Sequence, residues 1–241
     1  MDTIRVNSGG VKMVAHRGVS SLERENTTPA FVAAGNRSYY GVETDVHVTK
    51  DGKFVIIHNE TTKEVSLGAN CINVEENDYA AVADIILPDL DGSTIRQDIR
   101  IPLLCEYVHI CKKYGKKCVL ELKNHFQYDD IVKMIAEIEA LDYLDGMIYI
   151  SFDYENCTNL RKLLPNAEIQ WLTGGDPRPM IDKLVEDKLD LDVHYMQLDK
   201  ELIDLLHSKG IAINCWTCDN AKDARNLIMW GVDYITSNCL E

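Results

Sequence analysis

Short apolar runs rich in β-branched residues alternate with stretches of helical periodicity along almost the whole chain. This alternation is typical of a parallel sheet whose strands are joined by crossover helices. The predicted strands are Val11–His16, Val42–Val48, Phe54–His58, Cys118–Leu122, Met147–Phe152, Glu168–Leu172, Val193–Leu198, Ala212–Trp216 and Asp233–Thr236. The predicted helices are Pro29–Asn36, Leu103–Tyr114, Tyr128–Leu141, Tyr154–Leu163, Met180–Asp187, Lys200–Ser208 and Asn220–Trp230.

One pair of neighbouring strands cannot be parallel. Only Thr49–Lys53 separates Val42–Val48 from Phe54–His58, and a parallel crossover needs about a dozen residues or more. The Asp51-Gly52 pair favours a β-hairpin, and a turn centred on Asp51 would place His58 opposite Glu43. The other eight strands predict an α/β fold of the TIM (β/α)8 barrel type with this hairpin after its second strand. A doubly wound open sheet is the alternative.

A segment at about residues 61–100 interrupts the alternation, and we interpret it as a short insertion over one rim of the barrel. Long insertions in compact domains usually serve as lids or binding loops. The chain has 241 residues, 46% of them hydrophobic and 27% charged, which suits one folded domain spanning residues 1–241.

The charge balance restricts the partners. The 25 basic and 39 acidic residues give a net charge of −14, which disfavours nucleic acid and anionic lipid surfaces. A small anionic substrate is still compatible if a bound cation reverses the charge locally. No apolar run is long enough for stable membrane insertion, and residues 1–10 lack a signal-peptide pattern, so we expect a cytoplasmic protein.

The cysteines give little functional information. There are eight, and several lie inside apolar runs, so we expect free, mostly buried thiols. Cys215 and Cys218 form a CxxC pair, but no second pair accompanies it. A zinc or redox site is therefore the weaker interpretation.

Polar residues inside predicted strands are more informative, because burying them is costly unless they are paired or bind a ligand. His16 and Arg17 end the first strand, where a TIM barrel places active-site groups. Glu43, Asp45 and His47 alternate with valine and threonine, so they share one face of their strand. Glu121 and Lys123 share a face in the same way. Each set also has a structural alternative. His16 and Arg17 could be a capping histidine and a surface arginine, the β-strand of Glu43 could expose this face at the edge of a sheet, and Glu121 with Lys123 could be a buried ion pair.

Together with His58, these residues would provide two histidines, three carboxylates, one arginine and one lysine at one barrel mouth. Carboxylates without cysteine select a hard cation, Mg²⁺ or Ca²⁺. Arginine and lysine bind phosphate, and histidines transfer protons near neutral pH. The set therefore indicates phosphoryl transfer from a small-molecule phosphodiester.

At these residues the sequence resembles the glycerophosphodiester phosphodiesterase family, which shares a superfamily with phosphatidylinositol-specific phospholipases C. The matching segments occur in the family's order and extend from residue 14 to residue 238. They are His16-Arg17-Gly18, Glu25-Asn26-Thr27, Ala30-Phe31, Glu43-Thr44-Asp45-Val46, Thr49-Lys50-Asp51-Gly52, His58-Asn59, Ile101-Pro102-Leu103, Leu120-Glu121-Leu122-Lys123, Ser151-Phe152, Trp216-Thr217 and Gly231-Val232-Asp233. Any one of these segments is weak support, whereas the ordered set is specific.

The resemblance implies a TIM barrel that hydrolyses glycerophosphodiesters to glycerol 3-phosphate and an alcohol, using a divalent cation and histidine acid/base catalysis. The positions that match the catalytic pair are His16 and His58. The positions that match the ligands of the cation, Mg²⁺ or Ca²⁺, are Glu43, Asp45 and Glu121. The positions that match substrate-binding residues are Arg17, Lys123, Asn26, Phe152 and Trp216. For the last two, packing in the core is the alternative.

The sequence departs from the family pattern at Asn59, where the family usually has aspartate after the histidine. Asparagine can hydrogen-bond to the histidine but carries no charge, so a non-catalytic metal-binding barrel is one alternative function. A lysophospholipase D or a related phospholipase-type phosphodiesterase is another, for which the apolar residues 85–90 would have to form an exposed rim. Another metal-dependent barrel enzyme, such as an aldolase or a sugar isomerase, fits the two histidines less well.

Overall fold

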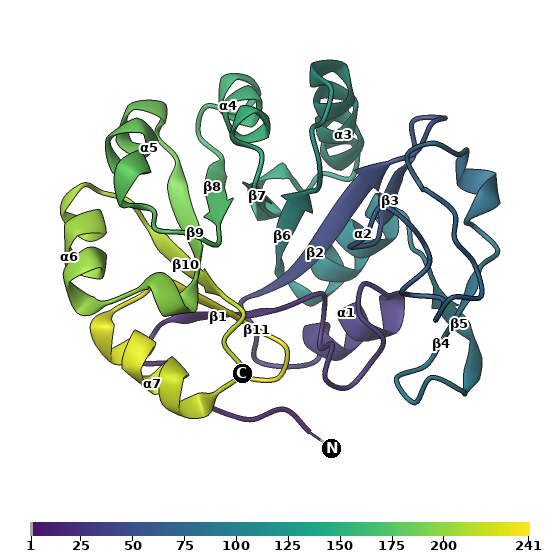
Figure 1. Ribbon diagram of the computed structural model, residues 1–241, viewed down its shortest axis with the longest axis horizontal. Coiled ribbons are helices and arrows are strands. Elements are labelled where there is room, and N and C mark those ends of the chain that lie inside the picture. The colour runs from purple at the N-terminus through teal and green to yellow at the C-terminus, as the bar shows by residue number, and fades with distance from the viewer. Residues whose placement is uncertain (1) are drawn as a thin grey trace.

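A computed structural model describes residues 2–241, and within them eight parallel strands close into a barrel with helices around it (Figure 1). The barrel strands are β1 (Lys12–Ala15), β2 (Gly41–Val48), β6 (Lys117–Leu122), β7 (Met147–Ser151), β8 (Glu168–Thr173), β9 (Asp190–His194), β10 (Ile213–Trp216) and β11 (Tyr234–Ser237). The barrel closes because β1 pairs in parallel with both β2 and β11. The predicted TIM-barrel fold is therefore confirmed.

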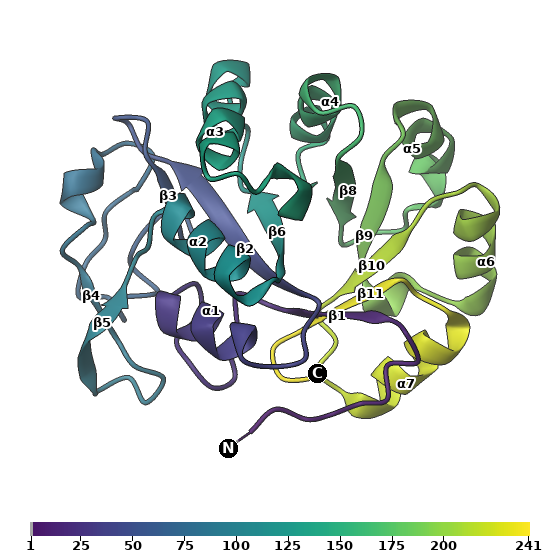
Figure 2. The ribbon, with the colours of Figure 1, turned by 180° about the vertical axis from the view of Figure 1, so that it is seen from behind.

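The outer ring consists of α-helices that follow the strands, as Figure 2 shows from the other side. They are α1 (Thr28–Gly35), α2 (Leu104–Tyr114), α3 (Tyr128–Ala140), α4 (Tyr154–Leu163), α5 (Ile181–Asp187), α6 (Lys200–Ser208) and α7 (Ala221–Trp230). Short 3₁₀ helices lie at Tyr79–Ala81, Leu144–Gly146, Arg178–Met180 and Tyr195–Gln197. Among the described residues, no helix is both long and apolar enough to cross a membrane.

Local sequence explains where several helices begin and end. The side chains of Asp153, Asp199 and Asn220 accept hydrogen bonds from backbone N–H groups in the first turns of α4, α6 and α7, which are otherwise unpaired. Helix α7 ends at Gly231, whose φ of 93° is readily adopted only by glycine. These signals account for the good agreement between the predicted and observed helices.

The alternation along the strands assigns side chains to two cores. Val42 and Val46 of β2, like Leu120 of β6, pack outward in the large core between the strands and the helices. Val119 of β6 points inward, in a smaller core with Val14, Ile148, Ile150, Leu172 and Tyr234. Glu43 alternates with the outward-facing valines and therefore faces the barrel interior.

One strand prediction was wrong. The run Val193–Leu198 is not a strand along its length, because β9 is Asp190–His194 and a 3₁₀ helix follows at Tyr195–Gln197. The prediction missed the start of β9 because aspartates occupy its first and third positions, Asp190 and Asp192, and interrupt the apolar pattern. Asp190 accepts a hydrogen bond from the backbone N–H of Ala212, and Asp192 faces the barrel cavity.

The predicted hairpin is present, but its predicted register was wrong by one residue. Strand β3 (Phe54–Ile56) is antiparallel to β2 and places Val48 opposite Phe54, whereas the predicted pairing of Glu43 with His58 would place Val48 opposite Lys53. His58 is therefore not a ladder partner of Glu43. His58 nevertheless lines the cavity at the barrel mouth, two residues beyond the end of the β2–β3 ladder at Ile56.

The insertion lies beyond β3, beside α1, and has a core of its own (Figures 1 and 2). Its two-stranded antiparallel sheet consists of β4 (Ile86–Pro88) and β5 (Ile95–Arg100). The small core contains Val55 and Ile57 from the hairpin together with Val65, Val74, Val82, Ile85, Leu87, Ile99 and Ile101. The insertion is thus a packed extension of the hairpin.

Candidate active site

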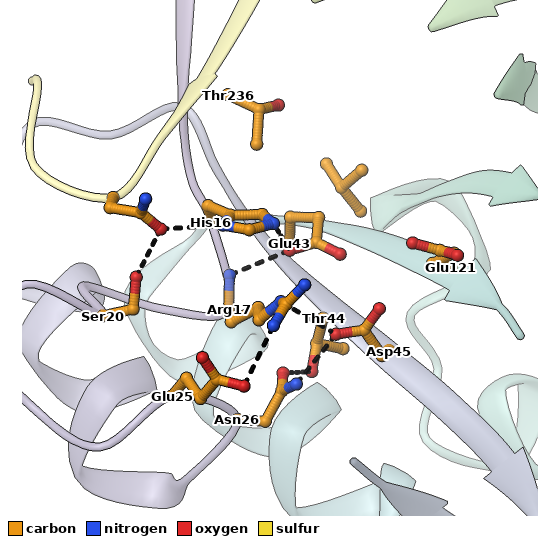
Figure 3. A network of polar contacts seen from close by, with 12 residues as sticks. His16, Arg17, Ser20, Glu25, Asn26, Glu43, Thr44, Asp45, Glu121 and Thr236 are labelled. Atoms are coloured by element: carbon orange, nitrogen blue, oxygen red, sulfur yellow. Dashed lines mark hydrogen bonds and ion pairs between the residues drawn. The ribbon is translucent and has the colours of Figure 1, made fainter. Parts of the chain in front are cut away.

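Strand register brings the predicted carboxylates together. Ala15 of β1 pairs with Val42 of β2, so the next residues, His16 and Glu43, are neighbours. Asp45 of β2 pairs with Glu121 of β6. Because these inward-facing residues occupy adjacent strands, their side chains meet inside the barrel mouth (Figure 3).

Glu43, Asp45 and Glu121 form a compact acidic cluster. Each offers a carboxylate oxygen, and these oxygens lie within 4.8 Å of one another, while the residues are only 3%, 1% and 8% exposed. The Oδ1 atom of Asp45 is buried without a hydrogen-bond partner. Three buried carboxylates at this spacing repel one another unless a cation lies between them, and an all-oxygen donor set suits Mg²⁺ or Ca²⁺. The cluster therefore fits a divalent cation.

Burial and the neighbouring charges give the three carboxylates different pKa values. Burial, reinforced by Asp45, raises the pKa of Glu43 well above its usual range and that of Glu121 to about 8. Burial also opposes ionisation of Asp45, but Arg17 and Lys123 outweigh it and lower the pKa of Asp45 to about 2. Without a cation, Asp45 thus holds the negative charge, and the two glutamates tend to keep their protons.

Two basic side chains flank the cluster. The backbone N–H of Arg17 donates to Glu43 Oε2 at 2.8 Å, and its guanidinium lies 3.0 Å from Glu25 Oε1 and 3.4 Å from Asp45 Oδ2 (Figure 3). Lys123 Nζ lies 2.7 Å from Glu121 Oε1 and 3.5 Å from Asp45 Oδ1. Both side chains also line the cavity, where they can contact an anionic group.

Asn26 lies behind Asp45. Its Nδ2 donates to Asp45 Oδ2 at 2.8 Å, and its Oδ1 accepts from Thr44 Oγ1 at 2.7 Å. The residue is only 4% exposed and has a φ of 55°, which asparagine tolerates better than most residues. These contacts orient Asp45, so the geometry gives Asn26 a supporting position rather than a place on the cavity wall.

The two predicted catalytic histidines line the same cavity. His16 Nε2 lies 3.9 Å from Glu43 Oε2, and its Nδ1 lies 2.7 Å from Asn238 Oδ1. His58 Nδ1 contacts Asn59 Oδ1. Burial lowers the pKa of both histidines below the ordinary value. Both are therefore largely uncharged at neutral pH, the state in which imidazole accepts a proton.

The cavity at the barrel mouth has a volume of about 190 Å³. It is lined by His16, Arg17, Glu43, His58, Glu121, Lys123, Ile150, Phe152, Leu172, Asp192, Trp216, Thr217 and Thr236. A larger cavity of about 320 Å³ lies at the opposite end of the strands, beside Lys117, Met147 and Glu168. It lacks a comparable cluster, and active sites in TIM barrels lie at the carboxyl ends of the strands.

Phe152 and Trp216 form one wall of this cavity. Their rings meet edge to face with centroids 5.6 Å apart, and Lys123 Nζ lies 5.9 Å from the centre of the Phe152 ring. Phe152 is 49% exposed, so it is not a core residue. The wall can contact the apolar side of a bound molecule.

Sequence reasoning missed the polar floor of the barrel. Asn214 Nδ2 donates to Gln170 Oε1 at 3.1 Å and to Asp192 Oδ2 at 3.2 Å, and Thr236 Oγ1 donates to Asn214 Oδ1. Burial raises the pKa of Asp192 well above its usual range. The two-residue spacing of Asp190 and Asp192, directly before the apolar Val193, was the sequence signal that could have indicated an inward-facing polar residue on this strand.

His47 has a different place from its neighbours on β2. Its Nδ1 lies 2.6 Å from Glu75 Oε1, and its Nε2 lies 3.2 Å from the carbonyl oxygen of His58. His47 therefore supports the backbone of His58 instead of joining the carboxylate cluster. The cysteines behave as expected, since all eight are free within residues 2–241.

Comparisons with known proteins agree with this geometry. The glycerophosphodiester phosphodiesterase of Caldanaerobacter subterraneus subsp. tengcongensis is 28% identical over 94% of this chain and 93% of its own length. That of Bacillus altitudinis is 27% identical over 93% of both chains. A solved structure of an Oleispira antarctica phosphodiesterase, in complex with the product sn-glycerol-3-phosphate, has the same fold. Its TM-score is 0.86 at 22% identity, over 98% of this chain and 96% of that chain.

The profile of the glycerophosphoryl diester phosphodiesterase family matches residues 16–241, nearly the full length of the chain. The match spans the acidic cluster, the two basic residues and both histidines, and it confirms the resemblance inferred from the ordered motifs. The chain therefore belongs to the glycerophosphoryl diester phosphodiesterase family, a group of phosphoric diester hydrolases.

Proposed function

We propose that this protein hydrolyses glycerophosphodiesters to glycerol 3-phosphate and an alcohol, using a divalent cation and a pair of histidines. The observation that carries the proposal is the cavity itself. It joins an acidic cluster, two basic side chains and two histidines at the carboxyl ends of the strands. The relatives named as glycerophosphodiester phosphodiesterases support the choice of substrate.

In the proposed reaction, one histidine removes the proton from the 2-hydroxyl of the glycerol moiety, whose oxygen attacks phosphorus. The other histidine, in its protonated imidazolium form, gives a proton to the departing alcohol oxygen, so the P–O bond to the alcohol breaks as the new one forms. Water then opens the resulting cyclic phosphate and yields glycerol 3-phosphate. His16 and His58 face the same cavity, as this exchange of protons requires.

The remaining residues would stabilise charge and orientation. Arg17 and Lys123 would contact the phosphate oxygens on which negative charge increases. Glu43, Asp45 and Glu121 would hold Mg²⁺ or Ca²⁺, which would supply further positive charge beside the phosphate. Asn26 would keep Asp45 in place, and Phe152 with Trp216 would exclude water from one side of the substrate.

Neither alternative function is favoured by a specific observation. Within residues 85–90, the stretch expected to form an apolar rim in a lipid-directed enzyme, Ile85 and Leu87 are buried in the insertion core and Leu90 is 46% exposed, so the stretch does not form a continuous exposed rim. Asn59 still contacts His58, so the substitution leaves the histidine with a hydrogen-bond partner. The single-domain boundary, the exclusion of nucleic acid and the cytoplasmic location stay predictions.

The direct test is release of glycerol 3-phosphate from a panel of glycerophosphodiesters, measured after EDTA treatment and again after Mg²⁺ or Ca²⁺ is restored. The proposal expects release that EDTA abolishes and one of these cations recovers. Activity that is insensitive to EDTA would remove the role of the acidic cluster. Absence of release with every headgroup, while the protein binds the cation, would refute the substrate class.

A further inference from the structure

Each cavity histidine contacts an asparagine that in turn contacts a carboxylate, although the two histidines lie on different segments of the chain. In each case the Nδ1 atom faces the amide oxygen of an asparagine. The amide nitrogen of that asparagine, in turn, donates to a carboxylate. These two carboxylates, of Glu64 and Asp219, do not belong to the family motifs identified in the sequence.

Behind His58, the pair comes from the start of the insertion. His58 Nδ1 contacts Asn59 Oδ1, and Asn59 Nδ2 donates to Glu64 Oε2 at 2.5 Å. Glu64 is exposed, so its carboxylate lies at the surface while the histidine lines the cavity. The insertion therefore supplies an anionic group that is connected to His58 through the side chain of Asn59.

Behind His16, the pair comes from the other end of the chain. His16 Nδ1 lies 2.7 Å from Asn238 Oδ1, and Asn238 Nδ2 donates to Asp219 Oδ2 at 2.6 Å. The other carboxylate oxygen of Asp219 accepts from the backbone N–H of Asn238 at 2.7 Å and from the Ser237 hydroxyl at 2.8 Å. Asp219 is thus held firmly in the orientation that fixes the amide.

These contacts determine which ring nitrogen carries the proton in each neutral histidine. An ionised carboxylate only accepts hydrogen bonds, so the NH₂ group of each asparagine must face it. The amide oxygen then faces Nδ1 and also accepts, so Nδ1 must be the protonated nitrogen. The Nε2 atom keeps its lone pair, which is the form needed to take a proton from a hydroxyl.

We propose that Glu64 is a positioning residue that acts through Asn59 to hold His58 in the Nδ1-protonated tautomer, as Asp219 does for His16 through Asn238. Its effect on catalysis rests on the function proposed above, whereas the tautomer itself does not. Where the family usually has aspartate directly on the histidine, this chain has an amide with a carboxylate behind it. The Asn59 amide keeps the His58 ring in its orientation. The Glu64 carboxylate determines that the oxygen of this amide, and not its nitrogen, faces the ring.

The tautomers can be read directly from the ¹⁵N chemical shifts of histidine-labelled full-length protein, with Mg²⁺ present at about pH 8, where neutral imidazole dominates. We expect the Nδ1–H form for both His58 and His16 in the wild type. In Glu64→Ala, the freed Asn59 amide can turn over, so the Nε2–H form of His58 should appear. His16, held by Asp219, should be unchanged and serves as an internal control.

Kinetics separate orientation from charge. Glu64→Ala should lower kcat about tenfold, the effect of one lost orienting hydrogen bond, while KM changes less than about twofold. Glu64→Gln keeps an acceptor for the Asn59 amide and should retain kcat within about twofold. Glu60→Ala removes another exposed carboxylate from the same segment, without a contact to either histidine pair, and should behave as the wild type.

The outcomes are distinct. An Nε2–H tautomer of His58 in the wild type, or unchanged His58 shifts in Glu64→Ala, would overturn the proposal whatever the enzyme's substrate. Equal kcat values for Glu64→Ala and Glu60→Ala would overturn its catalytic part. A wild-type protein without phosphodiesterase activity but with the expected tautomers would refute the proposed function and leave the positioning of His58 intact.

Discussion

The raised pKa of Glu121 makes the stability of the cation-free protein depend on pH. In the folded state its carboxyl group holds a proton up to about pH 8, whereas the ordinary value is 4.5. The folded state therefore binds more protons than the unfolded state between these values. It follows that the stabilisation is fully present below about pH 4.5 and is lost as the pH rises through about 8.

The size of this effect follows from the shift. Raising the pKa from 4.5 to about 8 corresponds to about 5 kcal/mol, at about 1.4 kcal/mol per pH unit. About three-quarters of it, on the order of 3 to 4 kcal/mol, should disappear between about pH 5 and pH 8. Glu43 and Asp192 act in the same direction, because burial raises the pKa of each well above its usual range.

Other groups titrate in this window, so the comparison needs a matched variant. Burial lowers the pKa of His16 and His58, which contributes stability that increases with pH and partly masks the effect. Glu121→Gln replaces the carboxyl group with an uncharged group of nearly the same shape. The difference in unfolding free energy between wild type and variant isolates the contribution of Glu121.

The assay is urea unfolding followed by circular dichroism, in EDTA, at several values between about pH 5 and pH 8. The wild type should lose on the order of 3 to 4 kcal/mol relative to Glu121→Gln over this range. Saturating Mg²⁺ should remove most of this loss, because ionised carboxylates then face a cation. A wild-type-minus-variant difference that does not change with pH would refute the interpretation that burial and the charge of Asp45 raise the pKa of Glu121 in the cation-free protein.

Three further outcomes are expected. Replacing His16 or His58 with alanine should lower kcat by about 10²–10⁴-fold, and near-wild-type release of glycerol 3-phosphate by either variant would contradict the paired role. Asp45→Asn should abolish measurable Mg²⁺ binding in calorimetry, whereas Asn26→Ala should weaken it about tenfold because it only orients Asp45. Phe152→Ala should raise KM more than it lowers kcat, and an unchanged KM would show that the ring does not contact substrate.

Local pattern was enough to predict the barrel and the faces of its strands. Alternation places Glu43 and Asp45 on the side opposite Val42 and Val46, since successive residues of a strand point in opposite directions. The short turn at Asp51-Gly52 predicts a hairpin because no crossover fits within it. The family motifs then identified the chemistry, because they preserve residue types at these inward-facing positions.

Tertiary structure decided everything that depends on which segments meet. The hairpin register differed by one residue from the prediction, because turn geometry and packing beneath β3 set it rather than the alternation alone. His16 meets Asn238 across 222 positions of sequence, through closure of the barrel between β1 and β11. Glu64 looks like an ordinary surface residue in the sequence. Its carboxylate meets the Asn59 amide five residues earlier in the chain, through an irregular turn that no strand or helix periodicity predicts.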